Sequence, residues 1–256
     1  MIDTSSERLF WCDFESTGLL DDHIPPTLLE AAWTISDGAG TQLTPLRKRL
    51  LAFTSNGADT VVTPDLGMHQ TGEPYGYFDT EDGPAPYPRQ IVIDMHEQSG
   101  LTTEWATAED ERPYSILRLP AEFDRLLLDD LITARVDTRA PRSLRLAGCG
   151  VAQFEAKIMP RVALRAMSSF WPWHYRTADL SVELSNGKIR GSDLLTDVDA
   201  IIEHGLKGAR VGGETWRDIT TETGHADITT FDIAHRADTD VARALAAWRL
   251  LALDHR

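Results

Sequence analysis

The sequence predicts a mixed α/β fold in a single domain, and three observations support this prediction. Apolar runs of strand length, separated by turn residues, occupy the first 54 residues, and segments with apolar residues at helical spacing follow later. The 256 residues are 42% hydrophobic, so the chain can bury a sizeable core. No internal repeat or low-complexity tract is visible. We therefore expect residues 1–256 to form a single domain.

The N-terminal elements are expected to be three strands. Residues 8–14 (RLFWCDF) and 28–36 (LLEAAWTIS) are rich in β-forming residues, and a turn that contains Gly and Pro separates them. Residues 46–54 (LRKRLLAFT) follow the same pattern. Consecutive strands with short connections predict a meander.

Helices are expected in the later part of the chain. Residues 121–136 (AEFDRLLLDDLITARV) have apolar residues at helical spacing, and Pro120 suits a first helical turn. Residues 143–150 (SLRLAGCG) predict a buried strand that ends in a Gly turn, followed by a helix over residues 152–167 (AQFEAKIMPRVALRAM). The last helix is expected from Thr239 to Leu253.

Two segments, about 55–90 and about 185–228, are expected to be loop-rich insertions. The first is dense in Gly and Pro turn signals such as EPYG and DGPAPYP. This density predicts a long insertion or lid with little regular structure.

Composition excludes several classes of protein. The net charge of −15 argues against holding long nucleic acid on a basic surface, although a phosphate substrate held by metal ions stays compatible with it. The two cysteines, Cys12 and Cys149, are too few for a disulfide framework or a zinc site, so both are expected to be reduced and buried. No signal peptide or membrane span is visible. We expect a cytoplasmic protein without membrane contact.

Two carboxylates at the end of the first strand raise the question of function. In FWCDFESTGLL (10–20), Asp13 and Glu15 are two residues apart, so their side chains share one face of a strand. Repulsion between them destabilises a buried pair. One interpretation is a strand end that emerges into water, and the other is a site for a divalent cation.

Further candidates for this chemistry lie far along the chain. Glu155 opens the helix after the strand that ends near Gly150, and His235 precedes Asp240 by five residues at the last helix. Carboxylate oxygens suit Mg²⁺ or Mn²⁺, and two such ions about 3.5 to 4 Å apart can clamp an in-line phosphoryl displacement. An imidazole can take the proton from the attacking water. Alternatively, Glu155 and Asp240 are ordinary first-turn acids and His235 is a helix-capping or surface residue.

The order of these motifs resembles the DEDDh family of 3′→5′ exonucleases. The matching pieces are DFESTG, an acid after an LAG strand, and His then Asp at a spacing of five. Three others resemble the oligoribonuclease branch, namely MHEQSGL (95–101), LAGCGVAQFEAKIMP (146–160) and HYRTADLS (174–181). The resemblance spans residues 10–245. It implies a ribonuclease H-like fold, with a mixed central sheet flanked by helices.

The resemblance also implies roles for individual residues. Its implied metal ligands for two Mg²⁺ or Mn²⁺ ions are Asp13, Glu15, Glu155 and Asp240, and its implied general base is His235. The implied substrate-binding residues are the apolar wedge Leu19, His96 near the substrate, the 5′-phosphate cap Arg176 and Ser181, and Tyr175. In the family, the equivalent of Tyr175 reaches the site of a partner subunit, which allows for a homodimer. The alternative for Leu19 and Tyr175 is a place in the core, and for Arg176 and Ser181 an ordinary loop Arg and a helix N-cap.

The chain departs from the family pattern at three places. The family's second acid is normally Asp, whereas this chain offers Phe154 and Glu155. The family's Asn-Ser after LAG is Cys149-Gly150 here, and Ile91 stands about where the family has a Trp. These departures bear on the implied length of the substrate more than on the implied catalytic type.

Three functions follow from this reading. The first is an exoribonuclease that degrades short single-stranded RNA oligonucleotides to nucleoside 5′-monophosphates, with short DNA as an alternative substrate. The second is a DEDDh exonuclease that trims longer single-stranded DNA or RNA, with the insertions forming a channel. The third is a non-catalytic nucleic-acid-binding or protein-binding descendant, against which the competent residues at all five catalytic positions count.

Overall fold

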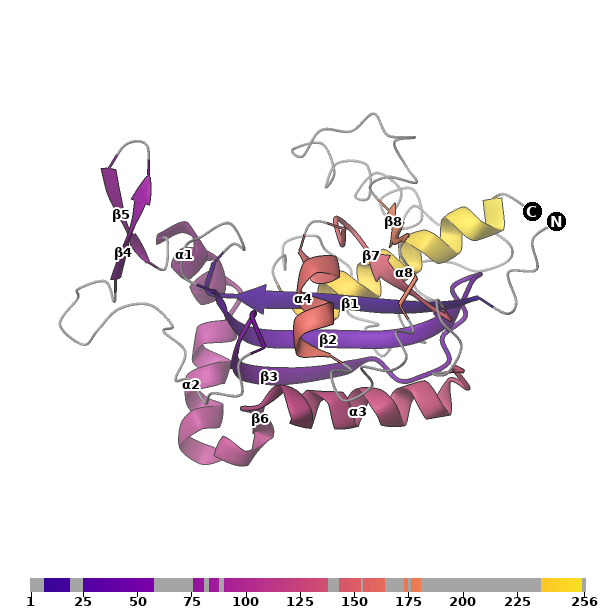
Figure 1. Ribbon diagram of the computed structural model, residues 1–256, viewed down its shortest axis with the longest axis horizontal. Coiled ribbons are helices and arrows are strands. Elements are labelled where there is room, and N and C mark those ends of the chain that lie inside the picture. The colour runs from indigo at the N-terminus through magenta and orange to yellow at the C-terminus, as the bar shows by residue number, and fades with distance from the viewer. Residues whose placement is uncertain are drawn as a thin grey trace.

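The computed structural model describes residues 7–18, 25–57, 76–80, 83–87, 90–137, 143–152, 154–163, 173–174, 176–180 and 236–254. Its centre is a six-stranded mixed sheet with the strand order β6-β3-β2-β1-β7-β8. Helices cover both faces of this sheet (Figure 1). This arrangement confirms the predicted α/β fold class, a mixed sheet flanked by helices, and is consistent with a ribonuclease H-like fold.

The predicted meander forms the middle of the sheet. The strands β1 (Arg8–Ser16), β2 (Thr27–Asp37) and β3 (Arg47–Thr54) pair in antiparallel fashion. The strand β7 (Leu144–Gly148) lies parallel to β1. It confirms the strand predicted within residues 143–150. Two short strands complete the edges: β8 (Ala178–Asp179) beside β7 and β6 (Ile116–Leu117) beside β3.

The predicted helices are present with shifted ends. They are α3 (Pro120–Thr133), α4 (Glu155–Val162) and α8 (Ala237–Asp254). The first ends earlier than the predicted residue 136, because Arg135 adopts a left-handed backbone with φ of 56°. The second is shorter than the predicted range 152–167, of which residues 164–167 lie outside the described residues. None of the helices that the structure describes combines the length and the apolar composition needed to cross a membrane.

Two helices before β6 were not predicted. The helices α1 (Gln90–Gln98) and α2 (Leu101–Glu111) are followed by the short 3₁₀ helix η1 (Pro113–Ser115). The buried residues of α2 are Leu101, Trp105 and Ala108, which follow helical spacing. Gly100 separates the two helices with a φ of 76°, a conformation that favours glycine.

The prediction of little regular structure over 55–90 was wrong in part. The strands β4 (Gly76–Thr80) and β5 (Gly83–Tyr87) form a hairpin there, while residues 58–75 lie outside the described residues. Pro84 and Pro86 stand two residues apart in β5, so both lack an N–H on the same side, which β5 can tolerate on an unpaired edge. The second insertion, 185–228, lies wholly outside the described residues.

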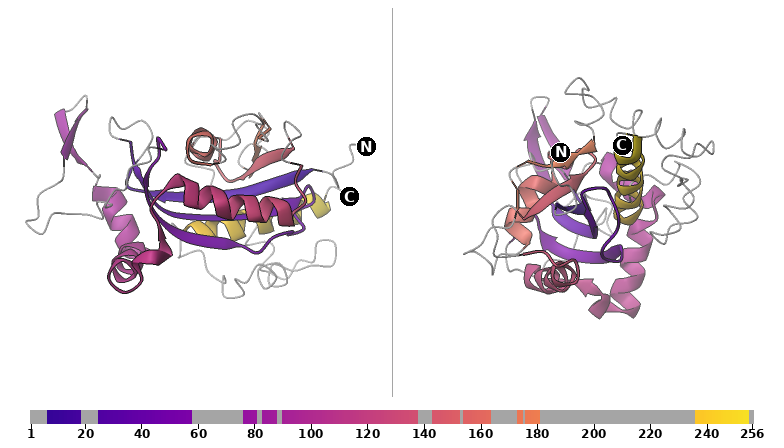
Figure 2. Two further views of the ribbon diagram at one scale, coloured as in Figure 1. Left: turned by 60° about the horizontal axis from the view of Figure 1, so that its bottom comes forward. Right: turned by 90° about the vertical axis from the view of Figure 1, so that its right-hand side faces the viewer.

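The two faces of the sheet carry different layers, and this positions the site. Phe10, Cys12 and Phe14 of β1 point into the core beneath α3 and α4. Leu9 and Trp11 point to the opposite face, which α8 covers. Figure 2 shows α8 on the other side of the sheet from α3 and α4. Because side chains alternate along a strand, Asp13 and Glu15 continue the row of Leu9 and Trp11 on the α8 face.

Candidate metal-binding active site

The strand β1 and the helix α8 bring three carboxylates together. Asp13 and Glu15 stand near the end of β1, and Asp240 stands in the first turn of α8. One carboxylate oxygen from each lies within 4.8 Å of the others. Glu15 is only 7% exposed, and the other two are half-buried. We call these three residues the acidic cluster.

The local backbone explains why the cluster forms at this point. Asp13 pairs with Ala32 and Glu15 with Glu30, and the register between β1 and β2 then shifts before Ser16. Such irregularities redirect side chains and end regular pairing, and they are frequent next to active sites. The α8 helix packs on the same face with small residues, which allows its first turn to approach the strand end.

Burial and mutual repulsion disfavour the charged forms of these carboxyls. Burial raises the pKa of Asp13 well above its usual value, and the charges of Glu15, Glu155 and Asp240 raise it further. Burial also raises the pKa of Glu15 to about 8; Asp240 and Glu30 add to this effect and Arg236 opposes it. Within the part of the chain that the structure describes, no Lys or Arg forms an ion pair with Asp13 or Glu15. In their charged forms, neither carboxylate is offset by a basic side chain of the described residues.

Glu155 lies beside the acidic cluster but outside the group of oxygens within 4.8 Å. It is the first residue of α4 and is buried, whereas Phe154 packs against the hydrophobic core. Burial raises the pKa of Glu155 to about 8, against the opposing effect of hydrogen bonds from the backbone amides of Glu155 and Phe14. Its charge in turn raises the pKa of Asp13. Of Phe154 and Glu155, the two residues that stand where the resembled family has its second acid, Glu155 is therefore the one that faces the cluster.

His96 contacts the same end of β1. The side chain is buried on α1, and its Nε2 lies 2.8 Å from the carbonyl oxygen of Ser16. Its Nδ1 lies 3.9 Å from Oε2 of Glu15. A proton on Nε2, donated to the Ser16 carbonyl, leaves Nδ1 as the nitrogen that faces Glu15. The structure thus brings His96 to the acidic cluster itself.

The other predicted site residues are not brought to the cluster by the described structure. Arg176 is exposed just before β8, where its backbone N–H donates to Nδ1 of His174 at 3.0 Å. The remaining four lie outside the described residues: Leu19, Tyr175, Ser181 and His235. Cys12 is buried as predicted, but Cys149 is exposed, because it stands in the turn that follows β7.

Asp179 is a buried residue that the sequence analysis missed. Its carboxylate accepts hydrogen bonds from the backbone N–H groups of Gly150 at 2.9 Å and Ala152 at 3.1 Å. Gly150 has a φ of 72°, which suits glycine and accounts for that departure from the family pattern. These bonds fix the turn that leads from β7 towards Glu155. The acid in HYRTADLS was the available signal.

A second set of charged residues beside the cluster was also missed. Glu30, fully buried on β2, accepts hydrogen bonds from Nη2 of Arg236 at 2.6 Å and from the backbone N–H of Ala237 at 3.0 Å. Arg236 also pairs with Glu104, and Lys48 lies 3.3 Å from Asp238 and 3.7 Å from Glu104. We call these residues the paired network: Glu30, Lys48, Glu104, Arg236 and Asp238. The network fixes the start of α8, three residues before Asp240.

The acidic cluster fits a divalent cation. Its donors are all carboxylate oxygens, the hard ligands that Mg²⁺ and Mn²⁺ prefer. Their separation of at most 4.8 Å is short enough for one ion to contact more than one of them. In the paired network, basic side chains of the protein balance the negative charge of a buried carboxylate on the same sheet. The acidic cluster has no such compensation at Asp13 and Glu15 among the described residues, and a bound cation would supply it.

Comparison with known proteins finds similarity only in solved structures. No protein-family model matches the sequence, and neither does any curated protein. A zinc-bound E. coli exonuclease I complex with single-stranded DNA matches 96% of this chain at 10% identity and a TM-score of 0.43. Exonuclease I from Methylocaldum szegediense matches 96% of this chain at 14% identity and a TM-score of 0.42. An E. coli exonuclease I complex with a dA16 oligonucleotide matches 97% of this chain at 12% identity and a TM-score of 0.44. The chain spans 40% to 42% of the length of these three proteins.

Proposed function

We propose that this chain is a metal-dependent 3′→5′ exonuclease that hydrolyses phosphodiester bonds. The observation that supports this most directly is the meeting of Asp13, Glu15 and Asp240 from opposite ends of the chain. Folding brings three like charges together in a partly buried place, which costs stability unless a cation binds there. Such a cluster is typical of a functional site.

In this proposal the carboxylates hold two Mg²⁺ or Mn²⁺ ions, with Glu155 as the fourth acid. Two such ions supply charge stabilisation to the attacking and leaving oxygens of an in-line displacement at phosphorus. His235 removes the proton from the attacking water. The new bond joins the water oxygen to phosphorus, the bond from phosphorus to the 3′ oxygen of the preceding nucleotide breaks, and that 3′ oxygen takes a proton from solvent. The product is a nucleoside 5′-monophosphate.

Residues around the acidic cluster have positioning roles in this scheme. Arg236, which follows His235, is held by Glu30, so the paired network fixes the chain next to the proposed base. His96 binds the Ser16 carbonyl and approaches Glu15, which restrains the end of β1. Asp179 restrains the turn before Glu155. Each of these contacts limits the movement of a proposed ligand or base.

The preferred substrate in this proposal is short RNA. Arg176 and Ser181 would cap the 5′ phosphate, Leu19 would separate the bases, and Tyr175 would come from the second subunit of a homodimer. A planar guanidinium suits a phosphate because it can donate two parallel hydrogen bonds. The second candidate is an exonuclease for longer single strands, which a basic pocket beside the paired network favours.

The test uses 3′-labelled and 5′-labelled RNA and DNA, as dinucleotides and as 24-nucleotide strands, with Mg²⁺, Mn²⁺ or EDTA. We expect hydrolysis from the 3′ end with release of nucleoside 5′-monophosphates, and we expect EDTA to stop it. Undiminished hydrolysis in excess EDTA would contradict the metal-dependent mechanism.

The substrate length is tested with Arg176→Ala. Loss of a charge-assisted bidentate contact costs about 1.5 to 3 kcal/mol, or roughly a tenfold to hundredfold loss of kcat/KM on 5′-phosphorylated dinucleotides. The 24-nucleotide strand, whose 5′ phosphate lies beyond the cap, should lose much less. Equal losses on both lengths would favour the second candidate. Arg161→Gln, an exposed change on α4, is the control.

A further inference from the structure

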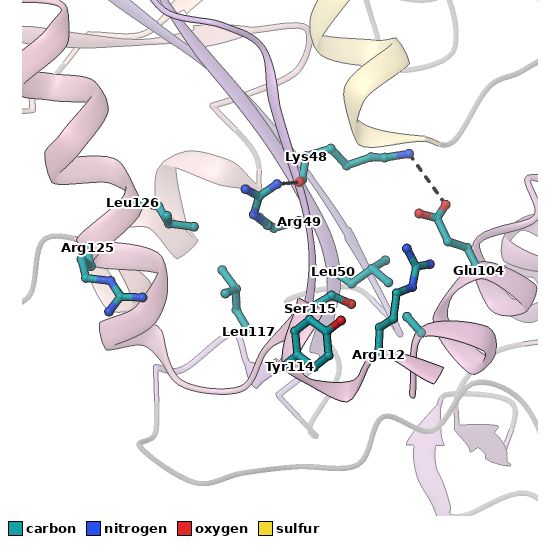
Figure 3. A pocket seen from close by; sticks show the side chains of 11 residues that line it. Lys48, Arg49, Leu50, Glu104, Arg112, Tyr114, Ser115, Leu117, Arg125 and Leu126 are labelled. Atoms are coloured by element: carbon teal, nitrogen blue, oxygen red, sulfur yellow. Dashed lines mark hydrogen bonds and ion pairs between the residues drawn. The ribbon is translucent and has the colours of Figure 1, made fainter. Parts of the chain in front are cut away.

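A pocket of about 430 Å³ lies at the β3 edge of the sheet, away from the acidic cluster. Residues from β3, α2, η1 and α3 line it, as Figure 3 shows. The short strand β6 pairs with β3 only at Leu50 and Leu51, so the preceding part of the β3 edge is open to this pocket.

Three guanidinium groups from three different elements surround it. Arg49 comes from β3, Arg112 from the C-terminal end of α2 and Arg125 from α3. Arg49 donates to the carbonyl oxygen of Lys48 at 2.6 Å. Within the described residues, none of the three forms an ion pair with a carboxylate. In a chain with a net charge of −15, three neighbouring guanidiniums without an ion pair among the described residues favour an anionic ligand.

An aromatic ring stands at the same place. Tyr114, in η1, is 84% exposed. Among the described residues, the other large hydrophobic side chain that is exposed, Ile132, is 72% exposed. In Figure 3 its ring lies between Arg112 on one side and Arg49 and Arg125 on the other. Leu50, Leu117 and Leu126 supply apolar surface to the pocket. An exposed ring with arginines around it is the combination on which bases stack while phosphates are neutralised.

The pocket shares a wall with the paired network, and through it approaches the acidic cluster. Lys48 and Glu104 line the pocket and form an ion pair with each other at 3.7 Å. Leu50 pairs with Glu30 across β2 and β3, and Glu30 pairs with Glu15 across β1 and β2. Two strand spacings, about 10 Å, therefore separate the backbone of Leu50 from that of Glu15. A strand that begins at the cluster needs few nucleotides to reach the pocket.

We propose that this pocket binds a nucleotide of a single-stranded nucleic acid whose 3′ end lies at the acidic cluster. The base stacks on Tyr114, and the adjacent backbone phosphates contact Arg49, Arg112 and Arg125. Three guanidiniums spread over three elements match a series of phosphates better than the one phosphate of a free mononucleotide. The placement of the 3′ end rests on the proposed function, whereas nucleotide binding in the pocket does not require catalysis.

Binding is measured in EDTA, where hydrolysis does not interfere, with fluorescein-labelled dT12 and U12 and the full chain. Tyr114→Ser should weaken binding about tenfold through lost stacking, and Tyr114→Phe should retain it because the ring remains. The triple change Arg49→Gln/Arg112→Gln/Arg125→Gln should reduce the slope of log affinity against log salt by about two, as expected for three lost phosphate contacts on a single strand. Arg161→Gln, outside the pocket, is the control and should change neither quantity.

Competition experiments separate the strand from other anions. Unlabelled dT12 should displace the probe, while dTMP and a twelve-residue polyglutamate should compete at least a hundredfold more weakly. Equal competition by dTMP would overturn the proposal in favour of a free-nucleotide site. Equal competition by polyglutamate, together with unchanged binding in Tyr114→Ser, would overturn it in favour of an acidic protein partner.

Hydrolysis and binding report on different proposals. If the pocket variants bind dT12 and U12 like the wild type, the pocket proposal fails even where hydrolysis is normal. If no metal supports hydrolysis, the proposed function fails. The pocket proposal still holds in that case if binding depends on Tyr114 and the three arginines. If both proposals hold, the pocket variants should lose activity on a 24-nucleotide strand, which reaches the pocket, and retain activity on a dinucleotide, which does not.

Discussion

Two groups of carboxylates lie on the same face of the sheet and differ in their counter-charges. In the paired network, buried Glu30 accepts from Arg236 and lies 4.0 Å from Lys48. In the acidic cluster, Asp13 and Glu15 have no Lys or Arg ion pair among the described residues, and only Asp240 contacts a guanidinium, that of Arg243 at 3.4 Å. Glu30 and Glu15 are cross-strand neighbours. Among the described residues, one buried acid thus has ion pairs with basic side chains, whereas its neighbour has none with Lys or Arg.

Both groups of residues show raised pKa values, which favour the charged form of an arginine and disfavour the charged form of a carboxyl. Burial opposes the charged form of Arg236, but hydrogen bonds and charges from Glu30 and Glu104 outweigh it and raise the pKa of the guanidinium above its usual value. Burial raises the pKa of Glu15 to about 8, and neighbouring acids add to it. The paired network therefore stabilises its charges, while the acidic cluster stores repulsion that a bound cation would relieve. The difference indicates structure in one place and function in the other.

The largest expected effect is on catalysis, in Asp13→Asn. Removal of residues that merely orient metal ligands costs 10-fold to 100-fold, so loss of a ligand is expected to lower kcat/KM by more than about a hundredfold. The free energy of unfolding of the metal-free protein should rise, because one buried repulsive charge is gone. Steady-state hydrolysis and urea unfolding measure the two effects. Asp129→Asn, an exposed change on α3, is the matched control for both.

The next effect is on stability, in Glu30→Gln. The amide keeps an oxygen for the Ala237 N–H, but Arg236 is left without its buried counter-charge. Breaking a buried ion pair in this way costs about 3 to 5 kcal/mol, measured as the free energy of unfolding in urea. The double change Glu30→Gln/Arg236→Gln should recover part of that cost. If Glu30→Gln and Asp13→Asn destabilise the protein equally, the two groups do not differ as we argue.

A somewhat smaller effect is expected from pH in the absence of metal. The pKa values of Glu15 and Glu155 are about 8 in the folded chain, above their usual value of 4.5, so the folded state binds more protons between these limits. Stability is therefore greatest below about pH 4.5 from these groups and falls as the pH rises towards 8, by a few kcal/mol. Urea unfolding in EDTA across this range measures the fall.

Added Mn²⁺ provides the comparison for the pH series. The ion competes with protons for the same oxygens, so it should restore stability most at pH 8 and least at pH 5. The double change Glu15→Gln/Glu155→Gln should flatten the metal-free profile. A profile that keeps its full slope in that double variant would attribute the fall to other acids of this strongly acidic chain.

Local patterns account for what the sequence predicted well. The meander follows from consecutive β-rich runs with short turns, and the placement of Asp13 and Glu15 on one face of β1 follows from alternation along a strand. The last helix was placed within two residues of its start at Ala237, because its apolar spacing is regular. These features depend on residues that are near one another in the chain.

Contacts between distant segments account for what the sequence did not reveal. Glu30 reads as an isolated acid in an apolar strand, and only the docking of α8 brings Arg236 to it. The basic pocket combines residues of β3, η1 and α3, which no local pattern links. The helix α2 was missed because only three of its residues, Leu101, Trp105 and Ala108, are buried, so its apolar stripe is narrow.

The smallest expected effect concerns Glu155, which lies between the two kinds of carboxylate. Backbone amides of Glu155 and Phe14 partly compensate it, as in a structural acid, yet its pKa is still raised to about 8, as in the acidic cluster. Glu155 lies outside the group of oxygens within 4.8 Å, so we expect it to contribute less than Asp13: Glu155→Gln should lower kcat/KM about tenfold to a hundredfold and raise the Mn²⁺ concentration for half-maximal activity, because a carboxylate is lost. Glu155→Asp should lose only a few-fold, since the charge survives at a shorter reach.

The decisive measurement for Glu155 is the Mn²⁺ dependence, with Asp129→Asn again as the control. A structural acid at the first turn of α4 would change stability without moving that dependence, because the helix N-terminus favours any negative charge there by only about 0.3 to 1 kcal/mol. Wild-type kcat/KM and an unshifted Mn²⁺ dependence in Glu155→Gln would place this residue with the compensated acids such as Glu30. A shifted dependence that Glu155→Asp largely restores would place it with Asp13, Glu15 and Asp240, and would mean that α4 supplies the fourth carboxylate through a side chain one methylene longer than aspartate.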